Sequence, residues 1–227
     1  MSELQPYQAD LIDKAMSVGA LKFGTFTLKS GREAPYFFNS GLLNTGPIIS
    51  ALAKAFASTI VNTQLESENP IPQFDVLFGP AYKGIPLAAM TVMELFNQHQ
   101  VSVGLAYDRK EVKDHGEGGN MVGVSVAGKR VVVLDDVMTS GKAVRGSIEL
   151  IGKQGGEVVG VVQCLDREEV GRDGVGSAVK EVEGIVGKGR VKAILKMRDL
   201  MMWLAENKME DELVKMRAYW DRYGLNK

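Results

Sequence analysis

The fold of this 227-residue chain is decided by the segment Val131-Val132-Val133-Leu134-Asp135-Asp136-Val137-Met138-Thr139-Ser140-Gly141-Lys142-Ala143-Val144. Four apolar residues predict a buried strand that ends at two adjacent carboxylates, Asp135 and Asp136. A short loop rich in Thr, Ser and Gly follows, and a helix begins after it. Backbone N–H groups of such a loop and of a helix N-terminus bind phosphate. Paired carboxylates can accept hydrogen bonds from adjacent hydroxyls, so the segment predicts a site for a sugar phosphate.

Two other phosphate-binding motifs do not match the sequence. A Walker loop needs glycine where Asp136 stands and Ser or Thr where Ala143 stands. A dinucleotide fingerprint fails at Gly174-Val175-Gly176, because Val179 occupies the place of its third glycine. The alternative that stays open for the segment itself is a generic strand-to-helix turn with solvated aspartates.

Apolar strands alternate with helices along the middle of the chain. The expected strands are residues 74–79, 101–106, 131–134, 158–165 and 191–195, and the expected helices are residues 46–61, 84–98, a helix that ends at 155–156, and residues 177–186. This alternation predicts an α/β fold with a parallel sheet and helices on both faces. Ligands of such sheets bind beyond the carboxyl ends of the strands.

The two ends of the chain have a different character. Residues 7–18 suit an amphipathic helix, and residues 23–28 and 36–39 suit a hairpin with Lys29 at its bend. We expect a single domain, with a small N-terminal hood mainly from residues 1–45, a core of about 46–205 and a C-terminal packing helix at 208–224. No function is assigned to that helix or to residues 171–188.

Composition and charge exclude several classes of protein. A formal net charge of −1 argues against a chain that neutralises nucleic-acid phosphates. The single cysteine, Cys164, excludes an internal disulfide and suits a reducing compartment. The first ten residues lack a signal-peptide pattern, and no apolar run approaches the roughly 20 residues that span a bilayer. We therefore expect a cytoplasmic protein that binds neither nucleic acid nor membrane.

A basic segment follows the second expected strand of the sheet. Its cationic or potentially cationic residues are Arg109, Lys110, Lys113 and His115, and it ends in the glycine-rich run 116–119. Such a glycine-hinged loop suits a lid that closes on a polyanion. The alternative is a solvated surface loop, since three acidic residues within the segment largely balance its charge.

The segment around Asp135 and Asp136 resembles the phosphoribosyl-pyrophosphate motif of the type I phosphoribosyltransferases. Further strings narrow the resemblance: residues 26–32 (FTLKSGR) with 35–39 (PYFFN), 79–86 (GPAYKGIP) and 109–119 (RKEVKDHGEGG). With Asp166-Arg167-Glu168, they resemble the orotate phosphoribosyltransferases from about residue 20 to about residue 170.

The resemblance implies a magnesium-dependent transfer of the 5-phosphoribosyl group from phosphoribosyl pyrophosphate to orotate, which gives orotidine 5′-phosphate and diphosphate in pyrimidine synthesis. Asp135 and Asp136 would bind the ribose hydroxyls, and residues 139–143 the 5-phosphate. The residues implied to bind the donor are Lys29, Tyr82, Lys83, Arg109, Lys110, Lys113, His115, Asp135, Asp136, Val137, Met138, Thr139, Ser140, Gly141, Lys142 and Ala143.

The resemblance also assigns catalysis, the base and the metal. The residues implied in catalysis are Lys113, Arg109, His115 and Asp136, and those implied to bind orotate are Phe37, Phe38, Thr139 and Arg167. The guanidinium of Arg167 would pair with the orotate carboxylate. Mg²⁺ is expected to bind mainly through the donor's diphosphate and ribose hydroxyls, with no firm direct protein ligand. The family pattern implies a homodimer in which the 109–119 loop reaches the neighbouring subunit's site.

The sequence leaves other interpretations of the site and of the function open. For Phe37 and Phe38 taken alone, ordinary core packing is an equal alternative. A phosphoribosyltransferase that uses a purine base would keep the same donor motif, as would a non-catalytic regulator that senses the donor and binds nucleic acid. The net charge of −1 disfavours the regulator. A ribose-phosphate pyrophosphokinase would need an ATP site, for which the sequence offers no motif.

Overall fold

The computed structural model describes residues 3–28, 30–65, 68–113, 119–171 and 176–225. The chain divides into two compact units, which are described separately. Unit 1 comprises Met1–Ala55, Leu165–Ser177 and Leu195–Lys227, and unit 2 comprises Phe56–Cys164 and Ala178–Ile194. Within the described ranges, no helix is both long enough and apolar enough to cross a membrane.

A six-stranded sheet with the order β5-β4-β3-β6-β7-β8 organises unit 2. Its strands are β3 (Val76–Gly79), β4 (Gly104–Lys113), β5 (Gly119–Gly123), β6 (Arg130–Asp135), β7 (Glu157–Asp166) and β8 (Val191–Lys196). β3 pairs in parallel with β4 and β6, and β6 with β7, as the alternation of strands and helices predicted. β5 was not predicted and pairs antiparallel to β4, so the sheet is only mostly parallel.

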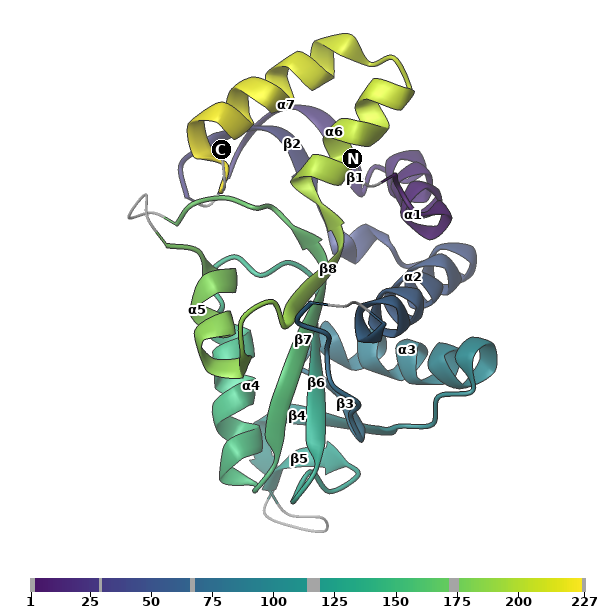
Figure 1. Ribbon diagram of the computed structural model, residues 1–227, viewed down its shortest axis with the longest axis vertical. Coiled ribbons are helices and arrows are strands. Elements are labelled where there is room, and N and C mark those ends of the chain that lie inside the picture. Colours follow the sequence, from purple (N-terminus) through teal and green to yellow (C-terminus); the bar gives the residue numbers. More distant parts are fainter. Residues whose placement is uncertain (1–2, 29, 66–67, 114–118, 172–175, 226–227) are drawn as a thin grey trace. The chain divides into compact units, whose positions relative to one another are not determined.

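Helices cover both faces of this sheet, which confirms the predicted layers (Figure 1). The helices are α2 (Gly46–Gln64), α3 (Gly84–His99), α4 (Lys142–Lys153) and α5 (Ala178–Val186). α4 and α5 lie on one face, and α3 and the end of α2 lie on the other. The core under α4 and α5 is aliphatic, because the β-branched residues of β6, among them Val131 and Val133, pack against Val144 and Val182 of the helices.

β7 carries one extra residue relative to β6. Val131 pairs with Val158, whereas the next residue of β6, Val132, pairs with Gly160, so the ladder skips Val159. The absence of a side chain at Gly160 has a packing reason, since a Cβ there would lie 3.0 Å from Cγ2 of Ile71. Beyond this bulge the two strands stay in register up to the end of β6, where Asp135 lies opposite Gln163.

The basic segment is partly a strand, which corrects the prediction of a loop from residue 109 to residue 119. β4 continues through Arg109 and Lys110 to Lys113, whose backbone pairs with that of Gly119 in β5. The charges of this segment obscured its strand character, but pairing with β5 satisfies its backbone. Residues 114–118, which include His115, lie outside the described residues, as does Lys29.

Unit 1 contains the predicted hairpin and several helices, and α2 begins in it. Its elements are α1 (Pro6–Ser17), β1 (Leu21–Thr27), β2 (Glu33–Phe38), the 3-10 helix η1 (Ser40–Leu42), α6 (Met197–Glu206) and α7 (Glu210–Tyr223). β1 and β2 pair antiparallel, which confirms the hairpin. The C-terminal helix is also present, as α7, and it buries Leu213, Met216 and Tyr219.

The sequence interpretation missed α6. Its buried residues Met197, Leu200, Trp203 and Leu204 recur at helical spacing. The indole N–H of Trp203 donates to Oδ1 of Asp13 over 3.0 Å, so α6 is fixed to α1. The amphipathic pattern was therefore present in the sequence and could have been recognised.

Candidate active site

The two adjacent carboxylates stand where β6 ends and a loop toward α4 begins. Oδ1 of Asp135 accepts the N–H of Asp136 over 2.9 Å, and Oδ1 of Asp136 accepts the N–H of Val137 over 2.8 Å. Each carboxylate therefore uses one oxygen to hold the loop's own backbone. The loop reaches α4 through Gly141, whose φ of 67° is a left-handed conformation that favours glycine.

The pKa of Asp135 is raised to about 6, mainly by burial and then by the negative charge of Asp136, and the hydrogen bond from the backbone of Asp136 opposes this rise. Two carboxylates side by side in a half-buried place resist ionising together. The group is therefore poised to gain or lose charge near neutral pH, as expected at a ligand-binding site.

A lysine from a second strand end reaches the same carboxylates. Lys83 lies in the turn between β3 and α3, and its Nζ is 2.8 Å from Oδ2 of Asp136. The turn is tight, since a Cβ on Gly79 would lie 2.2 Å from the carbonyl oxygen of Gly84. Glycines at both positions let the strand end and the helix start meet, and this places Lys83 beside the carboxylates.

Tyr82 and Lys110, both predicted to bind the donor, lie against one another. Nζ of Lys110 is 4.8 Å from the centre of the Tyr82 ring, a cation–π distance. Oδ1 of Asp108 in β4 accepts the N–H of Ala81 over 2.5 Å, which ties the Tyr82 turn to the same strand. The sequence interpretation missed Asp108, although it directly precedes the basic segment.

The loop after β6 is also held from behind by β7. The N–H of Cys164 donates to the carbonyl of Asp136 over 2.9 Å. The N–H of Met138 donates to the side-chain oxygen of Gln163 over 2.9 Å. Gln163 was not selected from the sequence, although one amide within a buried apolar strand was a usable signal.

The remaining donor residues of the loop lie around the start of α4. Met138 is buried, Val137 is half-buried, and Thr139, Ser140, Lys142 and Ala143 are exposed. The first N–H groups of a helix have no intrahelical partner and point outward along its axis. The loop thus offers exposed hydroxyls and backbone donors to an anion, next to the two carboxylates.

In unit 1, Phe37 of the predicted aromatic pair is exposed rather than part of the core. Phe37 is 40% exposed, and its ring centre lies 5.6 Å from that of Phe26. Both rings line a cavity of about 480 Å³, together with Lys22 and Asn39. Phe38 is half-buried. Phe37 therefore offers an accessible aromatic surface, which disfavours core packing for that residue.

Arg167, also in unit 1, is held by an acidic partner. Its Nε donates to Oε1 of Glu169 over 2.8 Å, and its Nη2 lies 2.7 Å from the same oxygen. Its guanidinium is 4.6 Å from the centre of the Tyr36 ring. Oε2 of Glu169 lies 3.5 Å from Nη1 of Arg32, whose guanidinium also donates to two backbone carbonyls. The sequence interpretation did not find Glu169.

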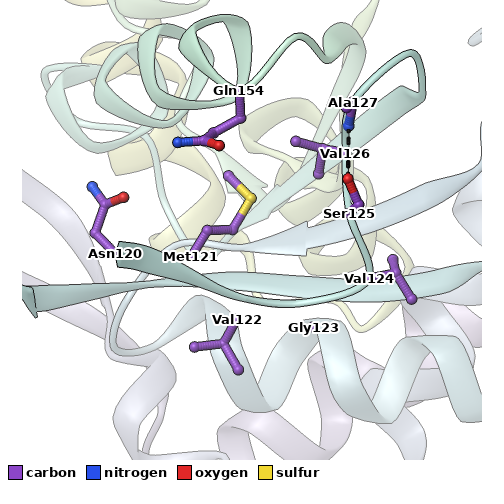
Figure 2. Close-up of a pocket in the computed structure, with 9 residues that line it drawn as sticks. All are labelled: Asn120, Met121, Val122, Gly123, Val124, Ser125, Val126, Ala127 and Gln154. Carbon is purple, nitrogen blue, oxygen red and sulfur yellow. Dashed lines mark hydrogen bonds between the residues drawn. The ribbon is translucent and has the colours of Figure 1, made fainter. Parts of the chain in front are cut away.

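A second pocket lies beside β5 and has a cavity volume of about 210 Å³ (Figure 2). It is lined by residues 120–127 and Gln154, and the hydroxyl of Ser125 accepts the N–H of Ala127 over 3.3 Å within it. None of the residues predicted to bind donor or base lines this pocket. The candidate site is therefore defined by the strand ends, and this hollow is separate from it.

Known proteins of similar sequence and structure identify the family. Residues 41–179 match the phosphoribosyl transferase domain family. The strand-end carboxylates, the loop before α4 and this match define a phosphoribosyltransferase. The chain is 48% identical to an orotate phosphoribosyltransferase of Halorhodospira halophila, over 96% of this chain and 98% of that one. It is 45% identical to one of Salmonella arizonae, over 98% of this chain and the whole of that one.

A solved structure agrees. The orotate phosphoribosyltransferase of Francisella tularensis has a TM-score of 0.83 and 36% identity, over 95% of this chain and 99% of that one. The chain belongs to the orotate phosphoribosyltransferase family of enzymes. The resemblance drawn from the sequence strings is thereby confirmed.

Proposed function

We propose that the chain carries out its family's reaction with the residues described above. It transfers the 5-phosphoribosyl group from 5-phospho-α-D-ribose 1-diphosphate to orotate and gives orotidine 5′-phosphate and diphosphate, a step of pyrimidine biosynthesis. The observation that carries the proposal is the junction of Asp135, Asp136 and Lys83 beside the start of α4. Two carboxylates, a cation and a loop suited to phosphate meet at the ends of neighbouring strands, and this arrangement supports the proposal.

The donor is bound by unit 2 in this proposal. Asp135 and Asp136 accept hydrogen bonds from the ribose hydroxyls, and the loop from Val137 to Ala143 surrounds the 5-phosphate. Lys83, with Tyr82 and Lys110 close to one another, binds the diphosphate. The ion pair between Lys83 and Asp136 supports this division, because Lys83 is 64% exposed and can reach an incoming anion. Lys29 is proposed as a further cation for the diphosphate.

The base is bound through Phe37 and Phe38 of unit 1, with Arg167 for the orotate carboxylate, and Thr139 of unit 2 is proposed as a further base contact. The exposed ring of Phe37 supports contact with a planar base. Glu169 holds the Arg167 guanidinium by a hydrogen bond from Nε and by the short distance between its Oε1 and Nη2. A fork-shaped contact to a second carboxylate would use the edge formed by Nη1 and Nη2.

Catalysis relies on charge in this proposal. Positive charge grows on ribose C1 as the bond to diphosphate breaks, and negative charge collects on the leaving oxygens. Arg109, Lys113 and His115 stabilise the leaving group, while Asp136 fixes the ribose. Residues 109–119 close over the donor and exclude water that would otherwise hydrolyse it.

Magnesium is proposed as the cofactor. Mg²⁺ prefers one or two carboxylates together with substrate phosphates. Among the described residues there is no cluster of three or more His, Cys, Asp or Glu side chains suited to a metal ion. Adjacent Asp135 and Asp136 fit a magnesium ion held chiefly by the donor, whose hydroxyls these carboxylates would bind. The ion would neutralise charge on the diphosphate.

We further propose that the chain works as a cytoplasmic homodimer, with residues 109–119 reaching the neighbouring subunit's site. The family pattern of that segment supports the dimer. The buried thiol of Cys164 is compatible with a reducing compartment.

An absorbance assay of orotate consumption tests the proposed function. Purified chain with donor and Mg²⁺ should consume orotate, and chelation of the metal should stop the reaction. Adenine and hypoxanthine should give no turnover. Turnover of a purine base without turnover of orotate would establish the alternative transferase. Donor binding with no turnover of any base would establish the non-catalytic regulator.

A further inference from the structure

Gln163 is a buried polar residue of unit 2 that lies beside the candidate active site. It belongs to β7, is 1% exposed, and pairs in register with Asp135 at the end of β6. Nearly all neighbouring positions of β7 carry apolar side chains or glycine. A buried amide in such a strand needs a specific partner.

Gln163 forms a hydrogen bond with the backbone of the loop after β6. Its Oε1 accepts the N–H of Met138 over 2.9 Å. The neighbouring N–H of Cys164 donates to the carbonyl of Asp136 over 2.9 Å. Gln163 and Cys164, two consecutive residues of β7, thus form hydrogen bonds with the N–H of Met138 and the carbonyl of Asp136 in one short stretch of the loop. Because the inward N–H of Met138 is satisfied from behind, the loop can direct its following N–H groups and hydroxyls outward.

The amide is only half satisfied. Within the described part of the chain, Nε2 of Gln163 has no hydrogen-bond partner. A buried unpaired NH₂ group destabilises the folded chain, and an apolar residue of the same length would avoid that loss. The contact that this buried amide makes is the one between its oxygen and the N–H of Met138.

We infer that Gln163 is a positioning residue for the donor. Its oxygen holds the Met138 N–H and so fixes the loop between Asp136 and Gly141 in the shape that receives the 5-phosphate. It touches neither donor nor base and acts through the loop. The inference rests on the proposed function, because it assigns that loop to the donor phosphate.

Three substitutions separate this role from simple packing. Gln163→Met keeps the length of the side chain and loses the oxygen. Gln163→Asn keeps the amide but is one methylene too short to reach Met138, and it serves if the Met variant does not fold. Gln163→Glu keeps an oxygen at the original distance, which can accept the Met138 N–H whether or not the carboxyl is protonated.

Steady-state kinetics with each substrate varied in turn give the main measurement. In Gln163→Met the KM for the donor should rise roughly three- to tenfold, which corresponds to the loss of one orienting hydrogen bond. The KM for orotate should stay within about twofold of the wild-type value. The Asn variant should behave like the Met variant, and the Glu variant should lie closer to wild type.

Thermal unfolding completes the test. A Met variant with a raised KM for the donor and an unchanged KM for orotate supports the inference, also where the unpaired N–H of Met138 lowers its melting temperature. A donor KM unchanged in both the Met and the Asn variants overturns it. Equal rises in the KM for donor and for orotate, together with a lower melting temperature, also overturn it, because they indicate a general packing role. Wild-type chain assayed in parallel separates the two proposals: no orotate turnover by wild type refutes the proposed function, whereas normal wild-type turnover with normal variants refutes only the role of Gln163.

Discussion

Nζ of Lys83 lies 2.8 Å from Oδ2 of Asp136, so an ion pair joins the turn after β3 to the loop after β6. The lysine side chain is 64% exposed and the aspartate 17% exposed. The pair therefore holds a largely enclosed anion with a cation that solvent can reach. Before the donor binds, each charge already lies beside a partner of opposite sign.

Asp136→Asn is expected to leave the chain folded and to lose donor affinity and rate. Removing one charge-assisted hydrogen bond costs about 1.5–3 kcal/mol, so kcat/KM for the donor should fall by about 10- to 150-fold. Glu149→Gln makes the same chemical change on an exposed residue of α4 and should keep wild-type kinetics. Wild-type kinetics in a folded Asp136→Asn protein would remove Asp136 from the donor site.

Asp135→Asn should stabilise the chain at pH 8 and not at pH 4. Burial and the charge of Asp136 raise the pKa of Asp135 from 3.8 to about 6, so the folded chain retains a proton that the unfolded chain has released near pH 5. Stability is therefore lost as the pH rises from about 4 to about 6, and asparagine avoids that loss. The gain at pH 8 should be on the order of 3 kcal/mol. Urea unfolding at both pH values measures it, and an equal effect at pH 4 and pH 8 would contradict the assignment.

Arg167→Ala should abolish most of the preference for orotate over uracil. A lost fork-shaped contact to a carboxylate is worth roughly 1.5–3 kcal/mol, so the ratio of the two kcat/KM values should fall about 10- to 150-fold. Activity with uracil is the internal control, because uracil lacks the carboxylate. Glu169→Gln should lower the ratio less, since it loosens the guanidinium without removing it. A wild-type ratio in Arg167→Ala would show that another residue binds the carboxylate.

Tyr82 and Lys110 should be energetically coupled. A cation over an exposed aromatic ring contributes about 0.5–1 kcal/mol. A double-mutant cycle with Tyr82→Leu and Lys110→Met, measured by urea unfolding, should give a coupling energy of that size. Tyr82→Phe keeps the ring and should retain the coupling. Additive effects of the two substitutions would mean that this contact does not hold Lys110 in place.

Mixing two variants of low activity tests the dimer and the proposed reach of residues 109–119. Lys113→Ala and Asp136→Asn should each lose most of their activity alone. If the loop serves the neighbouring subunit, each mixed dimer has one site with both residues intact. Random exchange gives about half mixed dimers, so roughly a quarter of all sites should recover activity. No recovery after proven exchange would show that the loop serves its own subunit.

The sequence predicted the parts of the site that depend on local order along the chain. The apolar run before Asp135 and Asp136 required a strand, and the Thr/Ser/Gly loop required a turn into a helix. Lys83 was predicted to bind the donor only through the family resemblance, and its place beside the carboxylates was not predicted. Pattern alone cannot decide which two strands become neighbours in a sheet, and β3 pairs with β6 across more than 50 residues of chain.

The missed residues share a physical cause. Glu169, Asp108 and Gln163 act through contacts with a backbone or side chain brought close by folding, and neither spacing nor composition marks them. β5 was missed because residues 119–123 contain two glycines and little apolar content, so that its pairing depends on β4. The charged residues of β4 concealed a strand whose backbone forms hydrogen bonds with β5.

The extra residue in β7 affects the proposed donor site through the register of the strand. Side chains of a strand alternate between its faces, so every residue beyond the skipped Val159 presents the face opposite to the one that an unbroken ladder would give it. If β7 paired with β6 without this bulge, Val162 rather than Gln163 would lie opposite Asp135, and the amide of Gln163 would face away from Met138. The skipped residue thus determines which side chain of β7 lies behind the loop after β6, although Val159 itself lies earlier in the strand.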